Sequence, residues 1–521
     1  MASATLPEKE AVARAVFDRL VAARGDHRLP EPHLTMVTSR RSGARCEGRL
    51  IVLEEAAYDL CMAFGKEAEA ALATVLAHEL IHYYAGHLQG REVLALVAKD
   101  SPGDADPAPS VTAEREADYQ GGFLAYLAGY AVTDLMPRFL DALYRTYALP
   151  EVLTGYPSLA ERKQQARLTQ ERLQRLIAVF EMANVLSALE RYDEAAAYYD
   201  YLLQAFPSRE IHNNTGVVYA RAALPYFQPT SLRYVYPIEL DLRSRLRGQT
   251  RSTGVDPATR DFYLREAQRQ FERARLLDPK YLPALVNLAA THTLLAASLA
   301  EGRPDSLQLA VADDLKLEAG LRARQAIRLA EASGKPASAT NAELLLGILA
   351  AQDGDTSRAE HHFGRATHSP LLAVNRAVLQ HGSLPPAPPP AESLPFVLPE
   401  LLDEASLDAL HAALPDTTIS LSGYGTPIQL ALLPSPHPAV TVLRHSAGPR
   451  SSLSVAVIGT DYPGNTTMGV GIADDYRTVV REYGTPDATV TTVGGTLAIY
   501  PDNKLLVSLR EDKVVGWYLY R

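Results

Sequence analysis

Apolar and polar residues follow several different periods along the chain, and each period predicts a type of element. Residues 8–23 place apolar side chains on one side of a helix, so an amphipathic helix is expected there. The runs His33–Val37 and Arg49–Leu53 read as short strands separated by a polar turn. Residues 71–88 lack proline and repeat small and apolar residues at helical spacing, which predicts a buried helix. Another helix is expected from about Thr112, which can act as its N-cap.

From about Leu173 the pattern becomes helical and repetitive. Tetratricopeptide units of about 34 residues place small and aromatic residues where two paired helices touch. The positions that fit this pattern are Met182, Ala183, Tyr192, Ala195, Tyr199, Pro207, Ala267, Phe271, Ala274, Pro279, Leu285, Leu288, Ala289, Leu346, Gly347, Ala359, Phe363 and Ala366. The stretch 224–258 interrupts the period and is either an inserted loop or an irregular unit. Stacked repeats commonly receive a peptide or a protein partner on their concave side, and plain helical hairpins without a ligand are the alternative.

Beyond a proline-rich linker the pattern changes to short strands, with a helix from about Asp474 to Glu482. The strands are expected at 440–443, 452–458, 489–493, 497–500, 505–509 and 514–520. No catalytic cluster is evident in this part, so it reads as an α+β accessory module. The sequence thus predicts an α+β multidomain protein. Its parts are a mainly helical zincin-like metallopeptidase domain (1–170), a tetratricopeptide α-solenoid (171–380), the linker (381–396) and the accessory domain (397–521).

Composition narrows the function classes. A chain of 521 residues is too long for one core and should form roughly three or four domains. A net charge of −10 argues against a nucleic-acid partner, which would need a basic face. No secretory signal is visible after Met1. The longest apolar candidate, Phe123–Met136, is too short to span a bilayer. A cytoplasmic protein without an integral membrane segment is expected, or an exported one if a signal has been removed.

The two cysteines, Cys46 and Cys61, are too few for a disulfide framework. Reduced and partly buried thiols are the favoured interpretation. A single bridge between the two is the alternative.

The main chemical signal is the pentad His78-Glu-Leu-Ile-His82 within the expected buried helix. Two histidines four residues apart share one helix face, so both imidazoles can reach one Zn²⁺ ion. Glu79 projects beside them, where it can act as the general base for a water molecule. This spacing is typical of the hydrolytic half of a zinc peptidase, and it requires a third ligand.

The next helix offers that ligand. Glu114 and Asp118 are four residues apart, so their carboxylates face the same way. Glu114 can complete a His₂Glu set for one zinc ion per chain. Asp118 can accept a hydrogen bond from the second ring nitrogen of a ligand histidine. A solvated helix face is the alternative, but Ala117, Gly121 and Gly122 make this side small enough for close helix packing.

His87 and the strand Arg49–Leu53 lie close to the pentad in the sequence. His87 lies five residues after His82, about 140° around a helix, so it reads as a second-shell or structural residue rather than a ligand. The strand Arg49–Leu53 precedes the pentad helix, and in a zinc peptidase a strand in that position can offer a free edge to an extended peptide. Leu50, Ile51 and Val52 are therefore candidate substrate-binding residues. An internal strand of a small sheet is the alternative.

The segments HELIHYYAGH and EREAD resemble the HExxHxxxxH and ExEAD motifs of the HtpX and CAAX prenyl-protease type of gluzincin metallopeptidase. Thr154–Arg162 is similar to the later HPxxxxR segment of this family, with Tyr156 in place of histidine. The resemblance covers roughly residues 7–170. It implies zinc held by His78, His82 and Glu114, with Glu79 as base. Tyr156 then either donates its phenol to the oxyanion or caps a loop.

The combination with tetratricopeptide repeats is similar to BepA-type bacterial proteases, which act in envelope quality control. This resemblance implies unfolded or misassembled proteins as substrates, recruited directly or through a partner by the repeats. The sequence therefore predicts a zinc metalloendopeptidase. A tetratricopeptide scaffold or chaperone with a vestigial or structural metal site is the alternative, although a purely structural zinc needs no Glu79.

Overall fold

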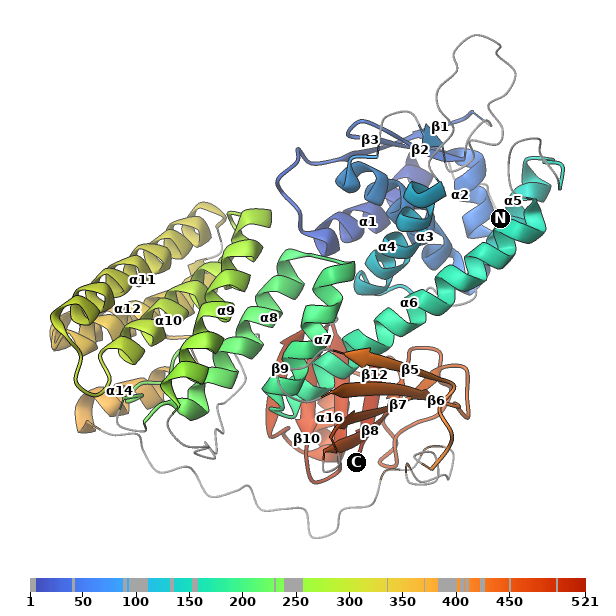
Figure 1. The fold of residues 1–521 in the computed structure, drawn as a ribbon. Coiled ribbons are helices and arrows are strands. Elements are labelled where there is room, and N and C mark those ends of the chain that lie inside the picture. Colours follow the sequence, from blue (N-terminus) through green and yellow to red (C-terminus); the bar gives the residue numbers. More distant parts are fainter. Residues whose placement is uncertain are drawn as a thin grey trace. The chain divides into compact units, whose positions relative to one another are not determined.

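The computed structural model forms two compact units, Met1–Ala178 and Val179–Arg521 (Figure 1). It describes residues 6–39, 43–87, 91–92, 111–131, 135–151, 158–228, 231–238, 256–334, 336–369, 371–382, 400, 402, 407, 412–421, 427–448, 451–492 and 495–521. Helices and strands occur in both units, so the α+β expectation is confirmed at that level. Most of the expected linker, residues 383–396, lies outside the described residues.

The first unit contains a four-stranded sheet of order β1-β3-β2-β4. Strands β1 and β3 are parallel, and the other two pairings are antiparallel. Both strands expected from the sequence are present, within one residue of the expected bounds. The bounds are β1 (His33–Val37), β2 (Ala44–Glu47), β3 (Leu50–Glu54) and β4 (Arg91–Glu92).

The expectation that Leu50, Ile51 and Val52 offer a free strand edge is wrong. These residues pair with β1 on one side and with β2 on the other. Because both rows of main-chain groups on β3 are used inside the sheet, an added peptide strand finds no free donors or acceptors there. The alternative interpretation, an internal strand, is the one that the structure supports.

Helices α1, α2 and α3 pack against this sheet in the first unit. The helix expected at residues 71–88 is α3, whereas α2 and the short turn Gly65–Glu67 before α3 were not expected. The helix expected from Thr112 begins one residue earlier, so Thr112 lies in its first turn rather than at the cap. The helices are α1 (Leu6–Arg24), α2 (Glu55–Met62), α3 (Ala68–Ala85), α4 (Val111–Leu127), α5 (Leu135–Thr146) and the first part of α6 (Leu159–Ala188).

In the second unit, successive helices pack against one another as a stack (Figure 1). In two pairs of neighbouring helices, a glycine on one helix lies against a phenylalanine ring on the other. A Cβ atom on Gly216 of α8 would lie 2.6 Å from the Phe271 ring of α9, and one on Gly347 of α12 would lie 2.4 Å from the Phe363 ring of α13. The helices are α7 (Tyr192–Ala205), α8 (Arg209–Ala223), α9 (Pro257–Leu277), α10 (Leu282–Leu299), α11 (Ser306–Ala332), α12 (Thr340–Gln352), α13 (Thr356–Arg365) and α14 (Leu372–His381).

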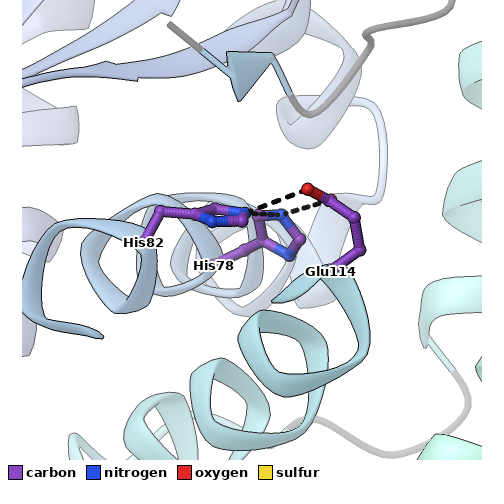
Figure 2. A group of neighbouring side chains, drawn as sticks. All are labelled: His78, His82 and Glu114. Atoms are coloured by element: carbon purple, nitrogen blue, oxygen red, sulfur yellow. Dashed lines mark hydrogen bonds and ion pairs between the residues drawn. The ribbon is translucent and has the colours of Figure 1, made fainter. Parts of the chain in front are cut away.

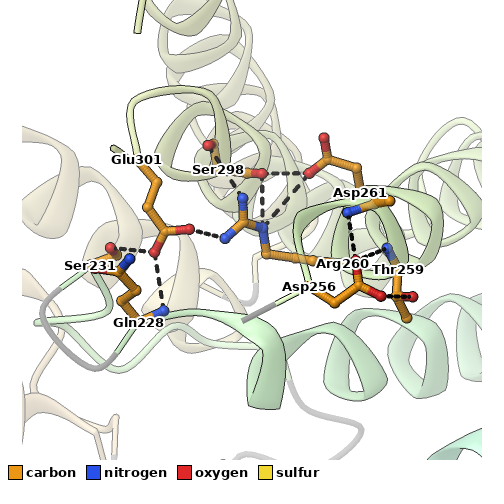
Figure 3. Close-up of polar contacts among 9 residues, drawn as sticks. Gln228, Ser231, Asp256, Thr259, Arg260, Asp261, Ser298 and Glu301 are labelled. Atoms are coloured by element: carbon orange, nitrogen blue, oxygen red, sulfur yellow. Dashed lines mark hydrogen bonds and ion pairs between the residues drawn. The ribbon is translucent and has the colours of Figure 1, made fainter. Parts of the chain in front are cut away.

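The interrupting stretch between α8 and α9 is fastened to this stack by a buried polar cluster (Figure 3). Arg260 of α9 is 2% exposed and donates to Ser298 Oγ of α10 at 2.9 Å and to the carboxylate of Glu301. Glu301 also accepts hydrogen bonds from Gln228 N at 3.0 Å and Ser231 Oγ at 2.6 Å. The start of the irregular stretch is therefore part of the packed stack.

One helix of the stack, α10, is long and apolar enough to cross a membrane, with a mean hydropathy of 1.4 over 18 residues. Yet 78% of this window is buried inside the fold, as in the core helix of a helical stack.

The second unit ends in an antiparallel sheet of order β5-β6-β7-β8-β12-β11-β10-β9. All six expected strands are present, whereas β5 and β6 were not foreseen. The expected helix is α16 (Tyr476–Tyr483), which ends at Gly484. The strands are β5 (Thr417–Leu421), β6 (Ile428–Leu433), β7 (Val440–Ala447), β8 (Ser452–Ile458), β9 (Ala488–Thr492), β10 (Gly495–Tyr500), β11 (Leu505–Arg510) and β12 (Lys513–Tyr520).

The sheet and the helical stack lie in the same compact unit. His445 of β7 is fully buried, and its Nδ1 lies 2.8 Å from the Tyr198 hydroxyl of α7. Tyr518 of β12 donates to the buried carboxyl group of Glu181 on α6. These side chains tie the sheet to the first helices of the stack.

Candidate metal centre

Helix α3 brings the pentad into the core of the first unit. His78, Glu79 and His82 are 8%, 0% and 3% exposed, and the surrounding helix is buried on almost every side. The helix ends at Gly86, whose φ of 66° is the left-handed conformation that favours glycine at a helix C-terminus. The pentad therefore lies in the last three turns of a helix whose position is fixed by packing.

Gly121 lets helix α4 approach α3 closely. A Cβ atom at this position would lie 3.0 Å from the backbone nitrogen of His78 and 3.1 Å from the carbonyl carbon of Ala77. Ala117, one turn earlier, is fully buried. Larger side chains on this face would push the helices apart, so the small residues are what bring Glu114 within reach of the histidines.

Three donor atoms from the two helices converge (Figure 2). The Nε2 atoms of His78 and His82 are 3.0 Å apart, and Glu114 carboxylate oxygens lie 3.4 Å from the first and 3.5 Å from the second. Zinc bound tetrahedrally at about 2.0–2.1 Å from each ligand separates its ligand atoms by about 3.3 Å. The three separations are close to this value, with one Glu114 oxygen facing each histidine, so the three side chains can supply ligands to one zinc ion. Within the residues that the structure describes, no other set of three such groups converges in this way.

The remaining ring nitrogens of both histidines also have partners. His78 Nδ1 lies 2.8 Å from Asp118 Oδ1. His82 Nδ1 lies 3.0 Å from His87 Nδ1, and His87 Nε2 in turn lies 3.6 Å from a Glu116 oxygen. The structure thus places Asp118 and His87 behind the two imidazoles, as expected from the sequence. A ligand histidine held at its second nitrogen has a fixed ring orientation.

The electrostatics of the cluster suit a cation. Burial opposes ionisation of Glu114, but hydrogen bonds with His78 and His82 outweigh it and hold the pKa of this carboxyl well below its usual range. Burial also lowers the pKa of His82. For His78, burial acts in the same direction, but hydrogen bonds with Asp118 and Glu114 outweigh it and raise the pKa. An anionic carboxylate therefore faces two imidazoles in a desolvated place.

Glu79 follows His78 directly on α3. Its carboxylate is fully buried and is close enough to Cys46 of β2 to affect that thiol. Burial, with a contribution from the Glu79 charge, raises the pKa of Cys46 to about 12. Cys46 and Cys61 are both buried free thiols, so the favoured interpretation of the two cysteines is confirmed. A thiol with so high a pKa is neutral near pH 7.

A hollow of ≈ 480 Å³, which includes open solvent, adjoins the cluster on the His78 side. His78 and Asp118 form one wall, and Met136 of α5 and Leu173 of α6 contribute apolar surface opposite. Sequence reasoning did not find this hollow, because its walls come from four helices whose packing no local pattern specifies.

Two of the site assignments predicted from the sequence are not confirmed by the described part of the chain. Tyr156 lies outside the described residues, so its role stays a prediction. Leu50, Ile51 and Val52 lie inside the sheet, as described above. The histidines, Glu79, Glu114, Asp118 and His87 are all drawn from α3, α4 and the residues that follow α3. Neither a protein-family model nor a curated protein sequence matches this chain.

Proposed function

We propose that this chain is a zinc-dependent metalloendopeptidase with the metal held by His78, His82 and Glu114. The proposal rests above all on one observation: two imidazoles four residues apart and a carboxylate from a second helix lie 3.0–3.5 Å from one another. This donor set has the chemistry and the spacing that zinc requires, and it leaves a fourth position of the tetrahedron for a reactant. When bound, Zn²⁺ supplies a Lewis acid that polarises a carbonyl group and acidifies water.

The residues of the chain have separate tasks in this proposal. Glu79 accepts a proton from the attacking water and passes it to the departing amine, a role that its position next to His78 allows. Asp118 holds the imidazole of His78 through Nδ1, at 2.8 Å. His87 holds that of His82 through a 3.0 Å contact. The hollow beside His78 offers room for a substrate side chain.

The helical stack gives the proposal its substrate class. Its paired helices, closed by Gly216–Phe271 and Gly347–Phe363 contacts, are consistent with tetratricopeptide repeats. Repeats of that kind bind extended protein segments or protein partners. We therefore favour unfolded or misassembled protein as substrate, by analogy with the gluzincin proteases that combine the two parts.

Zinc content and casein degradation, measured side by side, test this proposal. The parent protein is expected to hold about one zinc ion per chain and to degrade casein in a chelator-sensitive way. Glu79→Gln should keep the metal and lose at least a hundredfold in hydrolysis, because it removes the base without removing a ligand. His82→Ala should lose both.

Glu69→Gln is the matched control, because Glu69 is an exposed carboxylate on the same helix. It should change neither measurement. Hydrolysis by the purified Glu79→Gln protein at the parent rate would refute the mechanism. Zinc bound at full stoichiometry without any hydrolysis by the parent would favour the scaffold alternative instead.

A further inference from the structure

Residues 231–238 of the irregular stretch, here called the strap, are tethered at Ser231 by Glu301 and, beyond it, make side-chain and main-chain contacts with three helices of the stack. They contact α8, α12 and α14, which are far apart in the sequence. Tyr236 and Ile238 are 5% and 3% exposed. The strap is therefore an extended piece of chain that is packed into the helical stack without forming a helix or strand of its own.

Asn375 of α14 recognises the main chain of the strap. Its Oδ1 accepts a hydrogen bond from Val235 N at 2.8 Å, and its Nδ2 donates to Val235 O at 2.9 Å. Asn375 is fully buried, and Nδ2 also donates to Leu371 O of its own helix at 3.0 Å, which fixes its orientation. A pair of bonds to both polar groups of one residue is what an edge strand offers a peptide, and it does not depend on the side chain of that residue.

Helices α12 and α8 bind Tyr236 and Ile238, which follow Val235 in the strap. Gln352 Nε2 of α12 donates to the Tyr236 hydroxyl at 2.7 Å, and burial raises the pKa of that phenol. Arg221 Nε of α8 donates to Ile238 O at 3.2 Å. Between them, Ile238 N donates to Tyr236 O at 2.9 Å across the buried Pro237, which fixes a tight turn. The helices thus bind the main chain of Val235 through Asn375, which is called the clamp below. They enclose the Tyr236 side chain in a space, called the tyrosine hole, where Gln352 donates to the phenol. Arg221 donates to the Ile238 carbonyl oxygen.

These contacts hold an extended segment of chain mainly through its main-chain groups. The fully buried amide of Asn375 is paired with both main-chain polar groups of Val235, so this contact does not select a side chain at that position. An asparagine buried in this way would leave polar atoms of its amide unsatisfied, at a cost in stability, if no extended chain lay against it. The amide therefore requires an extended segment of chain as its partner.

We propose that this site is a recognition site for an extended segment of a protein partner, and that the strap occupies it as an internal ligand. The partner segment has tyrosine, proline and an aliphatic residue in that order, as in Tyr236–Ile238 of the strap, after an extended residue whose side chain is not specified. Because the strap is tethered, it competes at an effective concentration of roughly millimolar. A partner gains access only where it outcompetes the strap. The proposal does not depend on the metal centre.

Fluorescence anisotropy with a labelled peptide of the strap sequence, SLRYVYPI, tests this proposal on the full-length protein. Two variants release the strap in different ways: Val235→Pro removes the amide hydrogen that binds Asn375, and Tyr236→Ala empties the tyrosine hole. Both are expected to bind the peptide at least tenfold more tightly than the parent does. A peptide with alanine in place of the second tyrosine should bind neither variant.

The recognition residue is tested in the same background. Asn375→Leu added to a released variant should abolish peptide binding, whereas Gln380→Leu, an exposed change on the same helix, should leave it unchanged. The proposal is overturned if a released variant with a cooperative thermal transition fails to bind the peptide, or if binding survives Asn375→Leu. Failure of both released variants to fold would also overturn it, because the strap would then be a part of the core.

Discussion

His78 presents its two ring nitrogens to two different carboxylates. Nε2 faces Glu114 at 3.4 Å, and Nδ1 faces Asp118 at 2.8 Å. Because Asp118 accepts the Nδ1 hydrogen, the lone pair of Nε2 is left for a metal ion. A single ring therefore depends on two residues of α4 that are four positions apart, one as a fellow ligand and one as a support.

Asp118→Asn tests this support. The amide can turn its donor toward Nδ1 and favours the wrong tautomer, so zinc affinity should fall about 10–100-fold. A competitive chelator titration of the purified protein measures the change. Asp141→Asn is the control, because the Asp141 carboxylate accepts hydrogen bonds from Lys163 on a different part of the first unit. Equal zinc affinity in the parent and in Asp118→Asn would contradict the assigned role.

At the scale of elements, one glycine sets the spacing between α3 and α4. Gly121→Ala places a methyl group 3.0 Å from the backbone of His78, where no flexible side chain can yield. We expect the two helices to separate and zinc affinity to fall at least tenfold, with a lower melting temperature. Zinc titration and calorimetry measure both effects.

Gly364→Ala of α13 is the control for this change. A Cβ atom there meets nothing within 4 Å, and alanine favours a helix over glycine by about 1 kcal/mol. This variant should keep its zinc affinity and lose no stability. If Gly121→Ala behaved in the same way, the close approach of the helices would not control the site.

The elements found from the sequence are those with strong local patterns. The pentad helix and the strands β8 and β12 have long apolar runs, and the spacing of His78 and His82 is itself a local feature. Strand β2 was missed because its four residues, ARCE, contain two charges. Helix α2 follows β3 directly, without a proline or glycine to mark the change.

Contacts between segments that are far apart in the sequence were predicted less well than the elements themselves. The free edge expected for Leu50–Val52 was wrong because β1 joins β3 in parallel and β2 covers its other side. The packing of the strap could not be predicted from the sequence, because Asn375 lies 140 residues beyond Val235. Neither the strap nor helix α14 has a local sequence pattern that indicates contact with the other. The convergence of Glu114 with the histidines was predictable only because small residues marked the packing face of α4.

At the scale of the whole molecule, the second unit contains a buried acid that ties its sheet to its helices. Glu181 of α6 accepts a hydrogen bond from Tyr518 of β12. Burial, only partly offset by this bond, raises the pKa of Glu181 from 4.5 to about 7. Between these two values the folded protein holds a proton that the unfolded chain has released. Folding then takes up a proton, and the stability of this unit falls as the pH rises.

Calorimetry of the full-length chain between pH 5 and pH 8.5 tests this prediction. The unit should lose roughly 3 kcal/mol of unfolding free energy over that range from Glu181 alone. Glu181→Gln keeps the hydrogen bond without the charge, so its stability should depend less on pH and exceed that of the parent above pH 7. Glu171→Gln, an exposed change on the same helix, should follow the parent curve. Parallel curves for the parent and Glu181→Gln would show that Glu181 does not titrate in this range.

The clamp on Val235 has an evolutionary consequence. Asn375 holds only main-chain atoms of that residue, so drift at position 235 costs little, whereas the asparagine has no substitute that both donates and accepts in the same place. Descendants of the same ancestor should therefore retain asparagine at position 375 while varying position 235 freely. A lineage that has lost the whole strap but kept the asparagine would be one in which another polypeptide has taken over its place.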